Sequence, residues 1–113
     1  MKGRPIDMHV HLATPGFFRT LGPFVEKVKA YFRAEFGEIA IEQALREYEE
    51  SGVGRLVLLP LDASRLTGVP GDTNDLMSEL QRVDPERVIA FATVDPLAGR
   101  RAVVELERAV KDL

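Results

Sequence analysis

Three short, nearly continuous apolar runs alternate along this chain with stretches of helical periodicity. The runs lie at 5–12, 55–61 and 87–94. Such runs are typical of parallel strands that helices cover on both faces of a sheet. Successive strands that are joined through helices form a parallel sheet with right-handed crossovers. The sequence therefore predicts an α/β fold with the order β-α-β-α-β-α.

Three helices account for most of the chain between and after these runs. The first has apolar residues at helical spacing, which are Ile41, Ala44, Leu45 and Tyr48. Thr73 or Asn74 can cap the second helix, which is expected to end before Pro85. The third has apolar residues at the same spacing, which are Val103, Leu106, Val110 and Leu113.

An additional helical insertion is expected at about 15–37. Its apolar residues indicate a helix that starts near Pro23, with Phe24 and Phe32 anchoring the segment to the core. Because the insertion follows the first strand directly, it should lie at the carboxyl end of that strand. Three strands cannot close a barrel and leave two open edges. We therefore expect residues 1–113 to form a single partial domain of a larger structure, the alternative being a small open sheet.

Composition narrows the classes of function. Hydrophobic residues make up 45% of the 113 residues, charged residues 29%, and the formal net charge is -3. This charge balance argues against a nucleic-acid-binding protein. The chain has no cysteine, so it can form neither a disulfide nor a thiolate site. No apolar run has the length of a membrane span. A cytoplasmic protein that acts on a small molecule fits these features.

The two histidines of the chain, His9 and His11, are two residues apart in the first predicted strand. Side chains alternate between the faces of a strand, so Asp7 should share their face. Their rings can converge on one divalent metal ion, for which neutral imidazole is a common ligand. Asp7 could be a weak third ligand, or an acceptor that orients a histidine ring. Hydrogen-bonded core histidines are the alternative, although burying three polar groups in a row is costly.

The segment IDMHVHL at 6–12 resembles the opening of the amidohydrolase superfamily, whose first barrel strand carries His-x-His. The resemblance is closest to the amidohydrolase-related branch that includes aminocarboxymuconate semialdehyde decarboxylase. Three further stretches resemble that branch in the same order, at 52–61, 73–76 and 84–96. The similarity extends over nearly the whole chain and corresponds to the N-terminal three βα units of the family.

The resemblance implies a TIM-type (β/α)8 barrel with a mononuclear divalent metal, usually zinc, and a reaction that is hydrolysis or non-oxidative decarboxylation. His9 and His11 would be the first-strand ligands. In the family, the other ligands come from the fifth and eighth strands, which a chain of this length does not reach. We identify no catalytic residue within the 113 residues and expect the isolated chain to have little or no activity.

Residues near the carboxyl end of the first strand are candidates for substrate binding. The family often acts on carboxylated substrates, and Arg19 could hold a carboxylate, although an exposed arginine is the commoner case. Phe17 and Phe18 could roof a pocket or anchor the insertion. Asp62 and Asp95 follow the second and third strands, where an aspartate is most often a cap or turn former.

Two other functions remain open at this point. Metal-dependent phosphoesterases of the TatD or PHP kind also open with His-x-His, but Leu12 and Ala13 follow the second histidine here where those families tend to have a polar residue. Alternatively, the chain could be a structural or pseudoenzyme module that forms a homo-oligomer through its open sheet edges.

Overall fold

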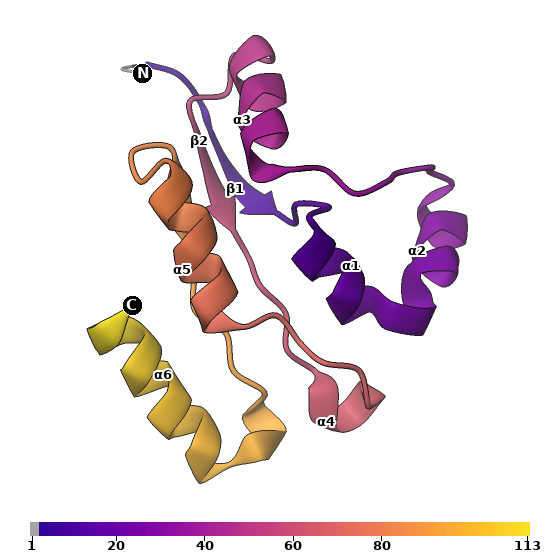
Figure 1. The fold of residues 1–113 in the computed structure, drawn as a ribbon, viewed down its shortest axis with the longest axis vertical. Coiled ribbons are helices and arrows are strands. Elements are labelled where there is room, and N and C mark those ends of the chain that lie inside the picture. Colours follow the sequence, from indigo (N-terminus) through magenta and orange to yellow (C-terminus); the bar gives the residue numbers. More distant parts are fainter. Residues whose placement is uncertain (1–2) are drawn as a thin grey trace.

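The computed structural model describes residues 3–113, and its centre is a parallel sheet of three strands (Figure 1). The strands are β1 (Ile6–Val10), β2 (Arg55–Leu58) and β3 (Val88–Ala90), in that order across the sheet. Both pairings are parallel, which confirms the predicted α/β class. Each strand is shorter than the apolar run that contains it, and β1 and β3 form the two edges.

Helices connect and flank the strands in the predicted alternation. Their bounds are α1 (Pro15–Leu21), α2 (Val25–Phe32), α3 (Ile41–Glu50), α4 (Ser64–Thr67), α5 (Asn74–Val83) and α6 (Arg100–Asp112), with 3-10 turns η1 (Gly22–Phe24) and η2 (Pro96–Ala98). Among residues 3–113, none of the helices combines the length and the apolar character needed to cross a lipid bilayer.

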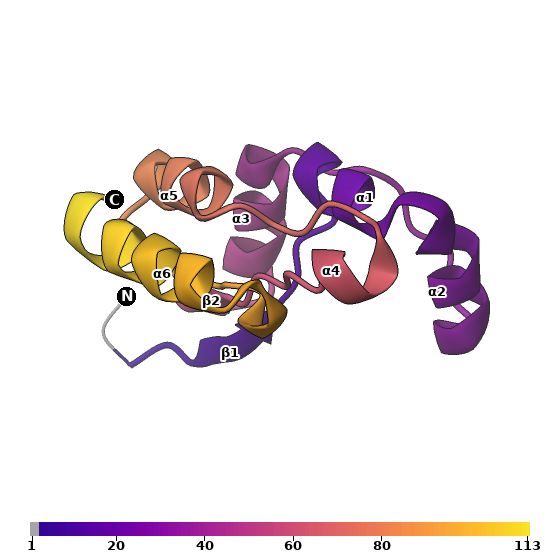
Figure 2. The ribbon, with the colours of Figure 1, turned by 90° about the horizontal axis from the view of Figure 1, so that it is seen from below.

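The core lies between the sheet and helices α3 and α5, which cover the same side of the strands (Figure 2). Leu56 and Leu58 of the central strand pack there against buried residues of both helices, among them Leu45 and Met77. Each fully buried aliphatic side chain of this kind contributes about 1.5–3 kcal/mol to folding. This core fixes the direction of the strands and brings their carboxyl ends to one edge.

The opposite side of the sheet is only partly covered, contrary to the expectation of strands buried on both faces. Met8 on the edge strand β1 is 60% exposed, whereas Val57 on the central strand is 1% exposed. Neighbouring strands flank Val57 on both sides, but Met8 has a neighbour on one side only. The difference follows from position in an open sheet, because a closed barrel would cover both residues.

The pairing of β1 with β2 slips by one residue between Asp7 and Val10. Asp7 pairs with Leu56 and Val10 pairs with Leu58, so three steps along β1 match two steps along β2. An extra residue of this kind is a β-bulge, and it changes which side chains share a face. Leu56 and Leu58 face α3 and α5. Asp7 and Val10 therefore lie on that helix-covered side as well.

The segment at 15–37 contains two helices where the sequence indicated one near Pro23. Thr14 caps α1, because its hydroxyl accepts a hydrogen bond from the backbone N–H of Phe17 at 3.4 Å, and Pro15 occupies the first turn. Figure 1 shows α1 at the carboxyl end of β1, as expected. The anchoring role expected for Phe32 is wrong: α2 has no buried residue, and Phe32 is 68% exposed.

Candidate metal centre

His9 and His11 bring their rings together at the carboxyl end of β1. Their Nε2 atoms are 3.0 Å apart, and the ring centroids are 4.9 Å apart with the planes at 77°. Both residues are exposed, so this chain does not bury them as the core-histidine alternative requires. The pair thus presents two nitrogen atoms toward one point.

The separation of the two nitrogen atoms fits a shared metal ion. Zinc–imidazole bonds are about 2.0–2.1 Å long, so two nitrogens on one zinc ion lie about 2.9–3.4 Å apart for angles between right-angled and tetrahedral. The observed 3.0 Å lies in this range. A hydrogen bond between two neutral imidazoles, one donating and one accepting, has the same separation. Both arrangements bring the Nε2 atoms together, but only the shared coordination requires a bound metal ion.

Phe17 lies against the His11 ring, with centroids 6.4 Å apart and planes at 21°. Phe18 packs edge-on against Phe17 at 6.1 Å and contacts Phe36 at 5.7 Å. Phe17 therefore lines the site beside a histidine, whereas Phe18 holds α1 to the segment that follows α2. A part in substrate binding stays a prediction for both residues.

Asp7 does not share the face of the histidines, and that expectation is wrong because the β-bulge turns its side chain toward α3. Its Oδ2 accepts a hydrogen bond from the Tyr48 hydroxyl at 3.2 Å, and its Oδ1 accepts one from the His9 backbone N–H at 3.1 Å. Burial raises the pKa of Tyr48 to about 12, helped by the charge and hydrogen bond of Asp7. Asp7 thus links the bulge to α3, and its role toward a metal stays a prediction.

An apolar cavity of about 390 Å³ adjoins His11, a size within the range of about 300–1,000 Å³ for small-molecule sites. It lies between the segment at 15–37 and the loop that follows β2. Its walls are mainly apolar and include Phe17, Leu21, Phe24, Val28, Leu61 and Val69. Phe24 and Phe32 both line this cavity, which is a different role from the core anchoring expected for them.

Asp72 is the one acidic residue among the described residues that line this cavity. Its Oδ2 accepts a hydrogen bond from the Leu61 backbone N–H at 2.9 Å. Burial raises the pKa of Asp72, and the Leu61 amide and the nearby His11 oppose that rise. Sequence reasoning missed this residue, because Asp72 lies in a glycine-containing loop outside every motif. The one signal in the sequence is the neighbouring Gly71. It packs so closely against Asp62 that a side chain would not fit there.

The remaining candidates lie away from the histidine pair. Arg19 is exposed in the last turn of α1 and does not line the cavity beside His11, so its part in substrate binding stays a prediction. Asp95 caps η2 by accepting from the Leu97 N–H. Its pKa is lowered mainly by a hydrogen bond from the Arg65 backbone N–H and further by the one from Leu97. Asp62 accepts from the Ser64 N–H. The expectation that both aspartates form caps or turns is confirmed.

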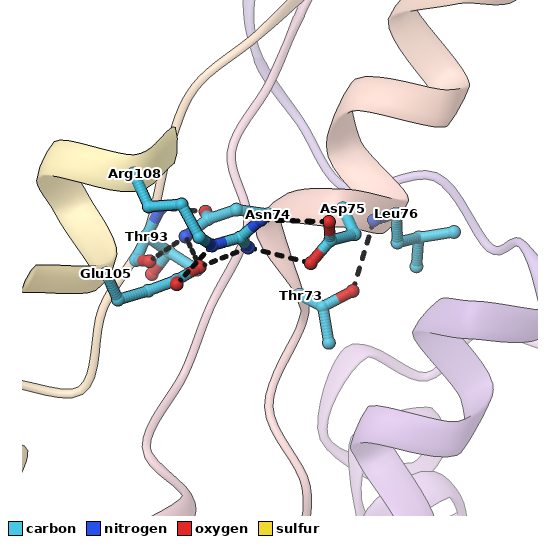
Figure 3. A network of polar contacts seen from close by, with 7 residues as sticks. All are labelled: Thr73, Asn74, Asp75, Leu76, Thr93, Glu105 and Arg108. Atoms are coloured by element: carbon cyan, nitrogen blue, oxygen red, sulfur yellow. Dashed lines mark hydrogen bonds and ion pairs between the residues drawn. The ribbon is translucent and has the colours of Figure 1, made fainter. Parts of the chain in front are cut away.

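A second polar cluster ties α5 to α6 near the same edge of the sheet (Figure 3). Asn74 donates to the Thr93 carbonyl at 2.9 Å and to Glu105 at 2.8 Å, and its Oδ1 accepts from the Thr93 N–H at 2.8 Å. Thr73, rather than Asn74, is the cap of α5, since its hydroxyl accepts from the Leu76 N–H at 3.1 Å. The Asn74 side chain instead hydrogen-bonds the backbone N–H and carbonyl of Thr93, as a neighbouring strand would do.

Arg108 completes this cluster. Its guanidinium donates to both oxygens of Asp75, at 3.1 and 2.8 Å, and to Glu105 at 2.8 Å. The hydrogen bonds from Arg108 and then Asn74 lower the pKa of Glu105 to about 2. The polar atoms of the cluster are therefore occupied by one another.

Within residues 3–113, no group of three histidine or acidic side chains could hold a metal ion. His9 and His11 therefore supply two ligands at most. A zinc site that supports catalysis usually has three protein ligands and one open position. The described residues thus cannot complete a zinc site of that kind by themselves, and metal binding by the histidine pair stays a prediction.

Comparisons with known proteins identify the fold. No protein-family model matches the chain, and no curated protein matches it. Solved structures of 2,6-dihydroxybenzoate decarboxylase do match. A complex with 2,6-dihydroxybenzoate aligns with a TM-score of 0.64 and 21% identity, and the enzyme from Rhizobium with a TM-score of 0.63 and 22% identity.

The extent of these alignments defines what is shared. They cover 99% of this chain but only 37% and 36% of the two decarboxylase chains. Identity of this order establishes a common fold and no more. The fold class expected from the sequence is therefore confirmed: the chain has the architecture of parallel βα units of a TIM-type barrel, as in these decarboxylases.

Proposed function

We propose that His9 and His11 form the first-strand half of a mononuclear divalent-metal site, with zinc as the first candidate. We further propose that the complete site catalyses hydrolysis or non-oxidative decarboxylation of a small carboxylated substrate. The observation that carries this proposal is the convergence of the two Nε2 atoms at 3.0 Å. The fold shared with 2,6-dihydroxybenzoate decarboxylase supports the reaction class and favours it over phosphoester hydrolysis.

The residues of this chain position the site. His9 and His11 would hold the ion through Nε2, and the stacking of Phe17 on His11 restricts the rotation of that ring. The hydrogen bonds of Asp7 keep the bulge in place, which sets the direction of His9. A bound divalent ion would supply a positive charge that polarises a substrate oxygen or a water molecule. The wall of the cavity beside His11 would contact an apolar part of the substrate.

A zinc titration of the chain, monitored by calorimetry, tests the metal-binding part of the proposal. We expect weak, saturable binding of one ion per chain, because only two protein ligands are present. His9→Ala and His11→Ala should each reduce the affinity at least about tenfold, since even loss of a group behind a ligand costs about 10–100-fold. Glu107→Gln, an exposed change on α6, is the matched control.

The outcomes of this titration are distinct. Equal zinc affinity in the wild-type chain and the two histidine variants would overturn the proposal, because the histidines would then not be the ligands. Loss of affinity in Glu107→Gln as well would point to non-specific surface binding. The reaction class is tested separately, by assaying release of carbon dioxide from hydroxybenzoates by a barrel that contains this segment.

A second candidate function is self-association, favoured by the apolar side chains that α6 exposes. Val103 and Val110 are well exposed there, while Ala102 is the only buried residue of the helix. The edge strand β3 is close to this helix, since Ala90 and Val110 line the same pocket. We propose that these surfaces form a homo-oligomer contact. Sedimentation of the wild-type chain and of Val110→Lys would test this, since a monomer at all concentrations in both proteins would reject it.

A further inference from the structure

The cavity beside His11 combines an apolar wall with a single carboxylate. Phenylalanine, leucine and valine side chains from α1, η1, α2 and the loop after β2 form the wall. Asp72 supplies the only formal negative charge among the described lining residues, and no lysine or arginine of residues 3–113 lines the cavity. The cavity is therefore suited to an apolar group but carries no positive side chain that would attract an anion.

Asp72 has capacity for a further hydrogen bond. A carboxylate has about four acceptor positions on its two oxygens. The Leu61 N–H occupies one of them on Oδ2, and the Thr20 side chain takes a second, so further positions remain. Hydrogen bonds to an ionised acceptor are among the stronger ones. A donor group on a ligand in this cavity would therefore find a fixed acceptor beside His11.

We propose that this cavity binds an apolar group that bears a hydrogen-bond donor, and that Asp72 accepts from that donor and repels a carboxylate. Asp72 is thus a specificity-determining residue of the cavity. This preference is set by the lining of the cavity and does not rest on the proposed metal site. An anionic group would meet the negative charge of Asp72 with no lysine or arginine among the described lining residues to offset it.

The test uses four matched probes on the metal-free chain: benzylamine, benzyl alcohol, anisole and benzoate. All have one aromatic ring, and they differ in charge and in the presence of a donor. Binding is followed by NMR titration of the backbone amides, with Leu61 and Gly71 as reporters of the cavity. We expect affinity to fall in the order benzylamine, benzyl alcohol, anisole, benzoate, because the first two can donate to Asp72 and the last is repelled.

Two variants make the ranking specific. Asp72→Asn keeps an acceptor for the Leu61 N–H but removes the charge. It should weaken benzylamine binding about tenfold, and benzoate should gain. Val69→Phe should fill the cavity and weaken all four probes. Glu107→Gln is the matched control, since it removes one exposed carboxylate charge on α6 that does not line the cavity, and it should leave the ranking unchanged.

Each outcome decides the inference. An unchanged ranking in Asp72→Asn, or probe-induced shifts confined to amides away from the cavity, would overturn it. Unimpaired probe binding in Val69→Phe would also overturn it, because the probes would then bind elsewhere. The zinc titration is independent of these measurements. Probe ranking without zinc binding would reject the proposed metal site alone, whereas zinc binding without the ranking would reject the role of Asp72 alone.

Discussion

Two polar clusters lie near the carboxyl ends of the strands, and they differ in how far their hydrogen-bonding capacity is used. Asn74 is 5% exposed, and its amide is bonded to Thr93 and Glu105. His9 and His11 are exposed, and their Nε2 atoms have only each other as hydrogen-bond partners among the described residues. A cluster whose polar groups hydrogen-bond with one another stabilises the fold. An exposed pair of converging ring nitrogens with no other protein partner among the described residues is suited to a ligand. The comparison separates structural polar groups from functional ones.

Replacing Asn74 should have the largest effect on stability. Asn74→Ala would leave the N–H and carbonyl of Thr93 without their side-chain partner, at about 1–3 kcal/mol for each buried group that stays unsatisfied. We expect a loss of about 2–3 kcal/mol in the free energy of unfolding, measured by urea denaturation. Glu79→Ala, an exposed change on the same helix, should have almost no effect. Equal losses in the two variants would mean that the cluster has no special structural role.

Tyr48→Phe tests the link between α3 and the β-bulge. The variant removes the hydrogen bond to Asp7 at 3.2 Å and keeps the ring that packs on the core. A net cost of about 0.5–1.5 kcal/mol is expected for one such bond, again by urea denaturation. If Asp7 holds the bulge in place, zinc affinity should fall as well. Unchanged stability and unchanged affinity together would show that this bond does not position His9.

Acid should weaken the cluster around Asn74 through Glu105. The pKa of Glu105 is about 2 in the fold, below its ordinary value of 4.5. The unfolded chain therefore takes up this proton first as the pH falls, so the stabilisation is present above about pH 4.5 and is lost toward pH 2. Because the side chain is partly exposed, we expect less than about 1 kcal/mol. Urea midpoints of the wild type and Glu105→Gln should converge over this range; parallel curves would contradict the assignment.

The histidines should have the smallest effect on stability. His9→Ala and His11→Ala remove exposed side chains that make no contact with the core cluster, so the free energy of unfolding should change by about 0.5 kcal/mol or less. Thermal or urea unfolding without metal measures this directly. A loss as large as that of Asn74→Ala would make the pair a structural cluster, and the contrast between the two regions would disappear.

The alternation of apolar runs and helical patterns was sufficient to predict the parallel sheet and the helices α3, α5 and α6. The pair His9 and His11 was also predicted to converge. The face on which Asp7 lies was not predicted correctly. A one-residue bulge shifts the alternation of side chains along β1, and no sequence pattern indicates this bulge. The role of Asn74 depends on Thr93 and Glu105, which are distant along the chain. Asp72 reaches the cavity only through the path of its loop.

The sequence contains a signal for the start of α1 that did not enter the prediction. Thr14 followed by Pro15 is a favourable cap and first-turn pair, but the expectation of one helix starting near Pro23 did not use it. The exposure of Phe32 has another origin, because the apolar stripe of α2 lines an open cavity rather than the core. Local patterns predict that a helix is amphipathic, but they do not identify the surface that its apolar side faces.

The most direct test of the central claim is nitrogen NMR of the two imidazoles during zinc addition to the 15N-labelled chain. The account predicts that the Nε2 resonances of His9 and His11 shift together and saturate at one ion per chain, while their Nδ1 resonances keep the pattern of uncoordinated nitrogen. A shift of one ring alone, a shift at Nδ1, or no saturable change in either ring would contradict it.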